Sequence, residues 1–158
     1  MPRMMGLSPN MQAFLTMITV SEIGRPLMAV SDEGYNVIVG STVARPYLFK
    51  SYKDHPLRFN PAVKSDAAGA YQIMGRFWPY YKKYLALTSF EPYEQDRVAI
   101  CLIRECHAYD DVNAGRFEDA VHKCRSRWAS LPGAGYGQHE NTLAFLTDAY
   151  REAGGVVV

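Results

Sequence analysis

The sequence has almost no net charge and no run of basic residues. Its 158 residues include 17 Lys and Arg against 16 Asp and Glu, which gives a formal net charge of +1 at pH 7. A chain this close to neutrality carries no broad field that would draw it to nucleic acid or to anionic lipid. We therefore expect no nucleic-acid partner and no stable association with membranes.

A continuous apolar run is also missing, although the stretch from Met4 to Ser21 carries no charge. Polar residues and a proline interrupt it at Ser8, Pro9, Asn10, Gln12, Thr16 and Thr19. A secretory signal needs about 7–15 continuous apolar residues, and a membrane-spanning helix about 20. We expect neither of them. We predict a single domain over residues 1–158, in which residues 1–10 form a poorly ordered extension.

Cysteine is scarce, with Cys101, Cys106 and Cys124 the only three. An odd number cannot pair completely within one chain, so we predict reduced thiols in a protein that folds in a reducing compartment. A metal site built from Cys101, Cys106 and His107 is the alternative, but its spacing does not match the usual two-residue knuckle. We predict that the thiols belong to the core, with no metal and no cofactor.

Hydrophobic residues are abundant, at 48%, and their spacing is mostly helical. The segment Tyr35–Val39 lies between two glycines and predicts a short strand, which could form a hairpin with Tyr47–Phe49. Prolines make residues 44–64 rich in loops. Further helices are predicted over residues 76–87, 92–105, 117–128 and 143–150. These elements define an α+β fold, one domain with a small β-rich lobe.

The first predicted helix ends on a glutamate. Ser8 and Pro9 are typical of a helix start, and Gly24 and Pro26 of its end. Its apolar face is formed by Met11, Phe14, Leu15 and Ile18. Glu22 follows the last of these by four residues and shares their face, where an apolar wall and the helix dipole would raise its pKa, as a general acid requires. A frayed helix end with Glu22 in solvent fits the spacing equally well.

A second notable segment is the glycine-dense stretch Gly133–Gln138. Glycines can cradle a phosphate where a strand leads into a helix, but here a helix precedes them and Pro132 intervenes. We therefore favour a loop that exposes its backbone along a cleft, with Tyr136 as an aromatic platform. An ordinary structural turn is the alternative.

Several segments resemble the endolysin family of bacteriophage lambda. They cover nearly the whole chain from about Met11, in the same order. The most specific is Trp128–Gln138, and the others are Ser21-Glu22, Gly34–Gly40, Tyr52 with Asp54-His55-Pro56, Asn60-Pro61, Lys64-Ser65, Ala68-Gly69, Tyr71-Gln72 and Glu152–Gly155. The resemblance implies a lysozyme-like fold, with a β-rich lobe flanking a substrate cleft, and a phage enzyme that cleaves the glycan strands of peptidoglycan.

The resemblance also implies roles for individual residues. The catalytic glutamate of the family falls on Glu22, and the cleft would be lined by Ser65, Tyr71, Gln72 and Tyr136. Family members act as lytic transglycosylases, which need a single glutamate. Two departures stand out: Asn36 replaces the aspartate of the family's Gly-Tyr-Asp-Val, and Ile23 replaces the glycine after the catalytic glutamate. Loss of a carboxylate at Asn36 agrees with one-acid chemistry.

Three functions stay open at this point. The first is a transglycosylase; the second is a hydrolytic muramidase, which would need a second acid such as Asp32, Glu33 or Asp54. The third is a glycan-binding module in which Glu22 is merely structural. For an endolysin we further expect a monomer that accumulates in the host cytoplasm and reaches the periplasm and cell wall after a holin breaches the membrane.

Overall fold

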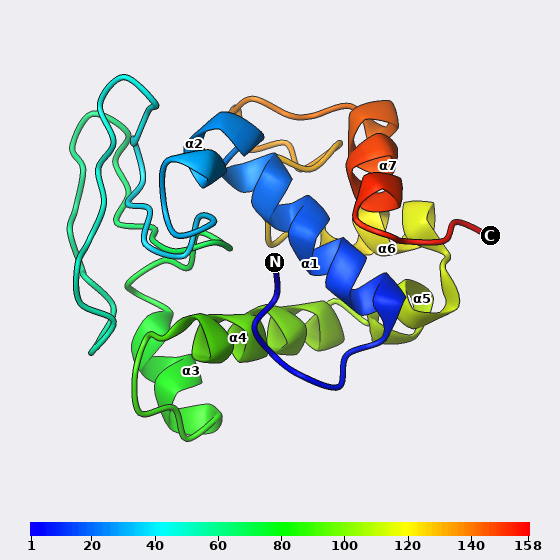
Figure 1. The fold of residues 1–158 in the computed structure, drawn as a ribbon, viewed down its shortest axis with the longest axis horizontal. Coiled ribbons are helices and arrows are strands. Elements are labelled where there is room, and N and C mark those ends of the chain that lie inside the picture. The colour runs from blue at the N-terminus through cyan, green and yellow to red at the C-terminus, as the bar shows by residue number, and fades with distance from the viewer. The chain divides into compact units, whose positions relative to one another are not determined.

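The computed structural model describes residues 1–158 and contains seven helices joined by irregular segments (Figure 1). Their bounds are α1 Pro9–Glu22, α2 Arg25–Ala29, α3 Trp78–Tyr84, α4 Pro92–Glu105, α5 Tyr109–Ala114, α6 Phe117–Cys124 and α7 Leu143–Glu152. The chain divides into two compact units. Unit 1 comprises residues 1–22 and 99–158, and unit 2 comprises residues 23–98. None of the helices has the length and hydrophobicity that a membrane span requires.

Helix α1 is the central helix of unit 1 (Figure 1). It starts as predicted, because Pro9 is its first residue and the Ser8 hydroxyl accepts a hydrogen bond of 3.1 Å from the backbone N–H of Met11. The buried residues are Met11, Ala13, Phe14, Leu15, Met17, Ile18, Thr19 and Val20. These surround the helix instead of forming the single predicted face, because α1 packs against both α5 and α7.

Aromatic contacts join α1, α6 and α7 in the core of unit 1. The Phe117 ring lies edge-on to Phe14, with centroids 6.2 Å apart, and stacks on Tyr150 at 4.5 Å. The helix predicted over residues 117–128 is shorter than expected, because α6 ends at Cys124. Trp128 is nevertheless buried, so the apolar spacing correctly indicated a core residue beyond the end of the helix.

Unit 2 pairs its backbone through isolated bridges and has no extended strand. Val37 pairs with Leu48 in antiparallel fashion, which confirms the predicted pairing of these two segments. The next residue, Ile38, pairs instead with Ala68. The prediction of a continuous strand over Tyr35–Val39 is therefore wrong, because adjacent residues bind different partners and no two segments stay side by side for long.

Two buried polar side chains of α4 hydrogen-bond to the loops of unit 2, where no extended strands pair with one another. Gln95 donates from Nε2 to the carbonyl oxygens of Tyr35 and Phe90, at 3.0 and 2.9 Å, and accepts at Oε1 from the N–H of Ala70 at 3.0 Å. The neighbouring Asp96 accepts at one oxygen, Oδ1, from the hydroxyls of Tyr35 and Tyr71 at 2.7 and 2.6 Å. The loops of unit 2 are thus fixed by helix side chains.

Candidate active site

Glu22 is the last residue of α1, and the chain turns directly after it. Gly24 adopts a φ of 83°, a conformation open to glycine, and α2 begins at the next residue. The side chain of Glu22 is half-buried. Burial raises the pKa of its carboxyl, and this outweighs hydrogen bonds from the hydroxyl and the backbone N–H of Ser130, which lower it. The raised pKa confirms the expectation from the helical face and excludes a frayed, solvated end.

A chain of hydrogen bonds within unit 1 leads to this carboxyl. The Ser130 hydroxyl donates to Oε1 of Glu22 in a very short bond. The hydroxyls of Ser21 and Ser130 lie 2.7 Å apart. Asn141 donates from Nδ2 to the Ser21 hydroxyl at 3.0 Å and to the Ser21 carbonyl oxygen at 3.2 Å. We call Asn141, Ser21 and Ser130 the donor chain of Glu22.

The donor chain has a fixed direction. The carbonyl oxygen of Ser21 can only accept, so the atom of Asn141 that faces it is the amide nitrogen, which can only donate. Ser21 therefore accepts from Asn141. Because the Ser130 hydroxyl donates to Glu22, the hydrogen between the two hydroxyls comes from Ser21. Oε1 of Glu22 consequently receives a hydrogen bond, and a proton on this carboxyl belongs on the other oxygen, Oε2.

The glycine-dense loop lies between two members of the donor chain. Its base is closed by a bond of 2.8 Å from the N–H of Asn141 to the carbonyl oxygen of Ser130. The carboxylate of Glu140 accepts from the backbone N–H groups of Gly133 and Gly135 at 2.8 and 3.0 Å. These bonds lower the pKa of Glu140 and occupy the groups that a phosphate would need. The loop therefore does not resemble a nucleotide site.

Tyr136 is exposed at the surface of this loop, with 57% of its area accessible. Its hydroxyl donates to the carbonyl oxygen of Ser126 at 2.7 Å, which holds the ring in place from its polar end. An aromatic ring with a fixed direction and a free face is a suitable platform for a sugar. The contact with a sugar stays a prediction.

The other predicted substrate-binding residues, Ser65, Tyr71 and Gln72, lie in unit 2. Ser65 is half-buried, and its hydroxyl accepts from the N–H of Ala67 at 3.1 Å. Gln72 is half-buried with a φ of 49°, unusual for a residue with a side chain, and donates from Nε2 to the Gly69 carbonyl oxygen at 3.0 Å. A strained backbone of this kind is often retained at a functional position. Binding of substrate by Ser65 and Gln72 stays a prediction.

Tyr71 requires a correction. Only 1% of the residue is accessible, and its hydroxyl donates to Asp96. Burial, followed by the negative charge of Asp96, raises the pKa of Tyr71 well above its ordinary value. A side chain with no exposed surface cannot contact a sugar in this conformation, so the structure makes Tyr71 an internal support of unit 2.

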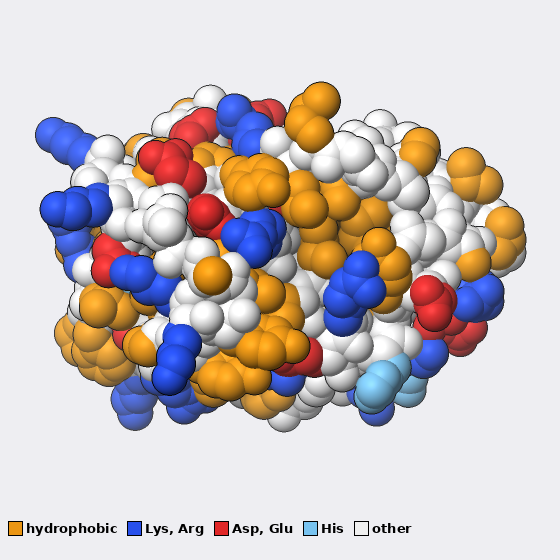
Figure 2. Space-filling view, turned by 90° about the horizontal axis from the view of Figure 1, so that it is seen from below, with side chains coloured by type: hydrophobic (Ala, Val, Ile, Leu, Met, Phe, Trp, Pro, Cys, Tyr) orange, Lys and Arg blue, Asp and Glu red, His pale blue; other side chains and the backbone are white.

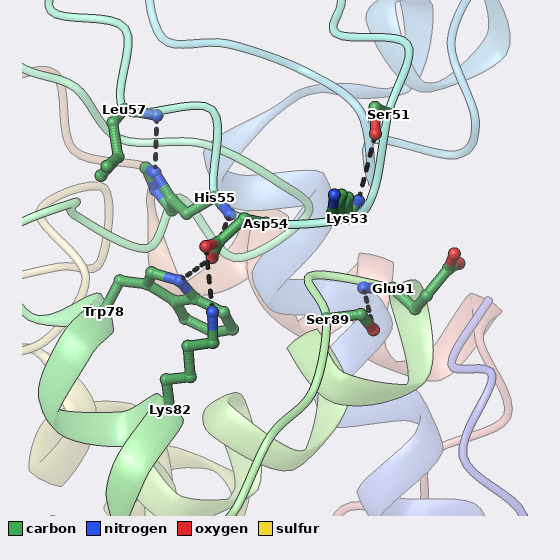
Figure 3. A network of polar contacts seen from close by, with 9 residues as sticks. All are labelled: Ser51, Lys53, Asp54, His55, Leu57, Trp78, Lys82, Ser89 and Glu91. Atoms are coloured by element: carbon green, nitrogen blue, oxygen red, sulfur yellow. Dashed lines mark hydrogen bonds and ion pairs between the residues drawn. The ribbon is translucent and has the colours of Figure 1, made fainter.

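Two of the three candidate second acids, Asp54 and Asp32, are hydrogen-bonded to other side chains of unit 2. Asp54 accepts hydrogen bonds from Trp78 Nε1 at 2.6 Å and Lys82 Nζ at 2.9 Å (Figure 3). Burial raises the pKa of Asp54, but these bonds and that from the N–H of His55 lower it overall. Asp32 accepts from the Tyr52 hydroxyl at 2.6 Å. A lowered pKa keeps Asp54 ionised, as a second carboxyl would need to be, but its oxygens are occupied by Trp78, Lys82 and the N–H of His55.

The three cysteines are free thiols. Cys101 and Cys124 are buried, which confirms their predicted place in the core, and Cys106 is half-buried. The hydrogen bond from Cys124 lowers the pKa of Cys106 to about 7. No group of three or more His, Cys, Asp or Glu side chains is arranged to hold a metal ion.

Sequence reasoning indicated Glu22 as a candidate catalytic residue but did not indicate its donor chain. Ser21 and Ser130 lie inside the segments that resemble the endolysin family, yet nothing local assigns them a role. Asn141 lies outside those segments. Its only signal is a position shortly after the glycine-dense loop, which the closure of that loop onto Ser130 explains.

Solved structures identify the class of protein. The chain matches bacteriophage lambda lysozyme complexed with a chitohexasaccharide with a TM-score of 0.87, at 40% identity, covering 98% of this chain and 100% of that one. A second structure of lambda lysozyme matches with a TM-score of 0.83, at 39% identity and the same coverage. The fold is lysozyme-like, as the resemblance implied.

Sequence comparison identifies the family. Residues 12–157 match the family model described as Endolysin. The endolysin of Escherichia phage P2 is 48% identical over 155 residues, covering 93% of this chain and 94% of that protein. The endolysin of Escherichia phage lambda is 40% identical over 158 residues, with coverage of 98% and 97%. The protein belongs to the endolysin family.

Proposed function

We propose that this endolysin cleaves the β-1,4 bond between N-acetylmuramic acid and N-acetylglucosamine in peptidoglycan as a lytic transglycosylase, with Glu22 as both acid and base. The observation that carries the proposal is the half-buried carboxyl of Glu22, whose pKa is raised and whose Oε1 is occupied by Ser130. A carboxyl whose pKa is raised above its ordinary value has the property that a general acid requires.

The reaction uses one carboxyl twice. Oε2 of Glu22 donates its proton to the oxygen of the glycosidic bond, and the bond from that oxygen to C1 of N-acetylmuramic acid breaks. The resulting carboxylate removes the proton of the C6 hydroxyl on the same sugar. The C6 oxygen then bonds to C1 and closes a 1,6-anhydro ring. Glu22 ends protonated, and no water is consumed.

Ser130 supports the middle of this cycle. Between the two proton transfers Glu22 is a carboxylate, which its buried surroundings disfavour. The Ser130 hydroxyl and backbone N–H stabilise that negative charge, and Ser21 and Asn141 hold the Ser130 hydroxyl in the donating direction. The site is therefore arranged for a carboxyl that must alternate between two protonation states.

A hydrolytic muramidase is the second candidate, which the name lysozyme of the solved relatives favours. Hydrolysis ordinarily uses two carboxyls, one to protonate the bond and one to direct water or attack C1. The ion pair of Asp54 with Lys82 and the bond from Tyr52 to Asp32 are reasons to favour the one-acid route.

Product masses test the proposal. Purified peptidoglycan is digested with the enzyme, and the released disaccharide peptides are analysed by mass spectrometry. Ring closure by the C6 hydroxyl gives fragments one water lighter than hydrolysis does, without a reducing end. We expect these anhydro fragments from the wild type and from Asp32→Asn, Glu33→Gln and Asp54→Asn. Reducing ends together with one indispensable carboxyl among the three would establish the muramidase instead.

Access to the wall is a separate proposal. We propose that the monomeric enzyme stays in the host cytoplasm until a holin opens the membrane. Cells that express the enzyme alone should keep growing, and a membrane-permeabilising agent should lyse them within minutes. Lysis at the same rate without permeabilisation would contradict this route.

A further inference from the structure

Unit 2 contains a basic hollow, an open cavity of about 770 Å³. Its wall includes four cationic side chains and one carboxylate: Lys50, Lys53, Arg58, Lys82 and Asp54. The lining thus has an excess of three positive charges, whereas the whole protein has a formal net charge of only +1. Positive charge is concentrated in this hollow.

Most of that charge is not neutralised within the protein. Lys82 pairs with Asp54 at 2.9 Å, and Asp54 is held in addition by Trp78 (Figure 3). By contrast, the side chains of Lys50, Lys53 and Arg58 have no carboxylate partner. Figure 2 shows one face of the protein, on which Lys and Arg side chains are interspersed with acidic and hydrophobic ones.

The basic hollow also has an apolar side. Phe49 contributes to the lining and is 4% accessible, and its ring packs edge-on to Tyr52 at 5.3 Å and against Phe90 at 5.9 Å. Leu48 and Pro56 line it as well. Rigid apolar groups beside free cations suit a ligand with carboxylates on short aliphatic chains. The concave shape suits such a small flexible ligand better than the flat surface of a membrane.

We infer that the basic hollow binds the carboxylates of the stem peptides that peptidoglycan carries on its glycan strands. The inference rests on the proposed function for its choice of substrate. The N-acetylated sugars of the strand are neutral and give three free cations nothing to bind. The stem peptides supply several carboxylates on aliphatic side chains, so their charge and shape complement Lys50, Lys53, Arg58 and the apolar lining.

Binding is tested without catalysis, by calorimetric titration of a soluble stem tetrapeptide. The triple variant Lys50→Gln, Lys53→Gln, Arg58→Gln should weaken binding by about tenfold, since exposed ion pairs contribute up to about 1 kcal/mol each. The control triple Lys64→Gln, Lys83→Gln, Arg151→Gln removes the same charge from exposed positions outside the basic hollow and should bind as the wild type does. Salt should weaken binding to the wild type.

Chemical variants of the ligand identify what is recognised. A tetrapeptide with all carboxyls amidated should fail to bind. Equal binding of the amidated peptide, or of the wild type and the first triple variant, would overturn the inference. So would equally tight binding of inorganic phosphate, which would make the basic hollow a site for any anion.

Activity measurements separate this inference from the proposed function. The wild type should have a lower KM for intact peptidoglycan than for peptidoglycan whose stem-peptide carboxyls have been amidated, and the first triple variant should lose that preference. An enzyme that binds the tetrapeptide but cleaves neither substrate would contradict the proposed function and leave the basic hollow supported. An enzyme that cleaves both substrates with equal KM would overturn the inference alone.

Discussion

The protonation of Glu22 depends on two opposing effects of its surroundings. Burial favours the neutral acid, and the bonds from Ser130 favour the carboxylate. A residue that donates a proton and then removes one needs both forms to be accessible. The donor chain therefore limits how far burial can raise the pKa, and a change at Ser130 should alter the pH dependence of catalysis as well as its rate.

Ser130→Ala tests this balance. Without its hydroxyl the pKa of Glu22 should rise further, so the alkaline limb of the pH–activity profile should move to higher pH. A hydrogen bond to a charged group contributes about 1.5–3 kcal/mol, so kcat should fall by about 10- to 100-fold. Both effects are measured as initial lysis rates between pH 4 and 9.

Thr147→Ala is the matched control, because this hydroxyl in the same unit bonds only to a carbonyl of its own helix, at Leu143. Its profile should coincide with that of the wild type. A Ser130→Ala enzyme that is slower but keeps the wild-type pH profile would show that Ser130 has no influence on the pKa of Glu22.

Glu22 should also reduce stability in a pH-dependent way. Its folded-state pKa lies above the ordinary value of 4.5, so deprotonation is more costly in the folded state. Below about pH 4.5 both states bind the proton and the cost vanishes; it grows as the pH rises through the folded-state pKa and then stays constant. Active sites often contain groups that lower the free energy of unfolding but are required for activity.

Glu22→Gln should therefore be inactive and more stable than the wild type at neutral pH. At this chain length each kcal/mol corresponds to about 2–4 °C in Tm. We expect a gain of this order at pH 7.5 that disappears towards pH 4, measured by thermal unfolding. A gain of equal size at both pH values would show that the carboxyl charge is not its cause, and wild-type lysis by the variant would remove Glu22 from the mechanism.

Among the elements, α4 has a structural role that exceeds that of an ordinary helix. Its buried Gln95 satisfies three backbone groups of unit 2, at Tyr35, Ala70 and Phe90. In a larger β-sheet such groups would pair with a neighbouring strand. Here one side chain satisfies them, so the order of the loops depends on α4.

Gln95→Ala should accordingly destabilise the protein far more than an average substitution. It leaves three buried backbone groups unpaired, each at about 1–3 kcal/mol, so we expect a loss of about 3–5 kcal/mol in the free energy of unfolding. Urea unfolding measures it. Gln12→Ala, at an exposed position of α1, should change stability by less than about 0.5 kcal/mol. Similar losses for the two variants would contradict the role assigned to Gln95.

The helices that the sequence predicted well have characteristic residues at their own ends or a clear apolar spacing. Ser8 and Pro9 mark the start of α1, and α4 has the predicted bounds Pro92–Glu105. Helices α2 and α5, of five and six residues, were not predicted because they are too short to display a hydrophobic period. The strand predicted over Tyr35–Val39 did not form because Val37 and Ile38 pair with two different segments that are distant in sequence, at Leu48 and Ala68.

The residues of the candidate site also differ in how far the sequence could predict them. The raised pKa of Glu22 was predictable because its position on a helix face is a local property; its catalytic role stays a prediction. Ser130 and Asn141 were not, because they lie 108 and 120 residues from their partners Glu22 and Ser21. The family resemblance assigned Tyr71 to a cleft. A tyrosine suits a sugar and a buried carboxylate equally well, and only the position of Asp96 decides between them.

At the scale of the whole molecule, the thiols report on folding. Cys101 and Cys124 are buried, whereas Cys106 is half-buried and has a pKa of about 7. At pH 7.5 the native protein should react with iodoacetamide at one cysteine within minutes, and unfolding should expose all three. Mass spectrometry counts the added groups. Three equal rates in the native state would contradict the packing of Cys101 and Cys124.

The position of unit 2 in the chain has a consequence during synthesis. Unit 1 begins with residues 1–22, is interrupted by residues 23–98 and resumes afterwards, so Glu22 is made early and Asn141 late. At about 5–20 residues per second, the ribosome needs about 6–24 s to add the 120 residues that separate Ser21 from Asn141. During that time the glutamate has no donor chain. Under the proposed mechanism, a ribosome-bound chain should therefore be inactive until residues 130–141 have been added.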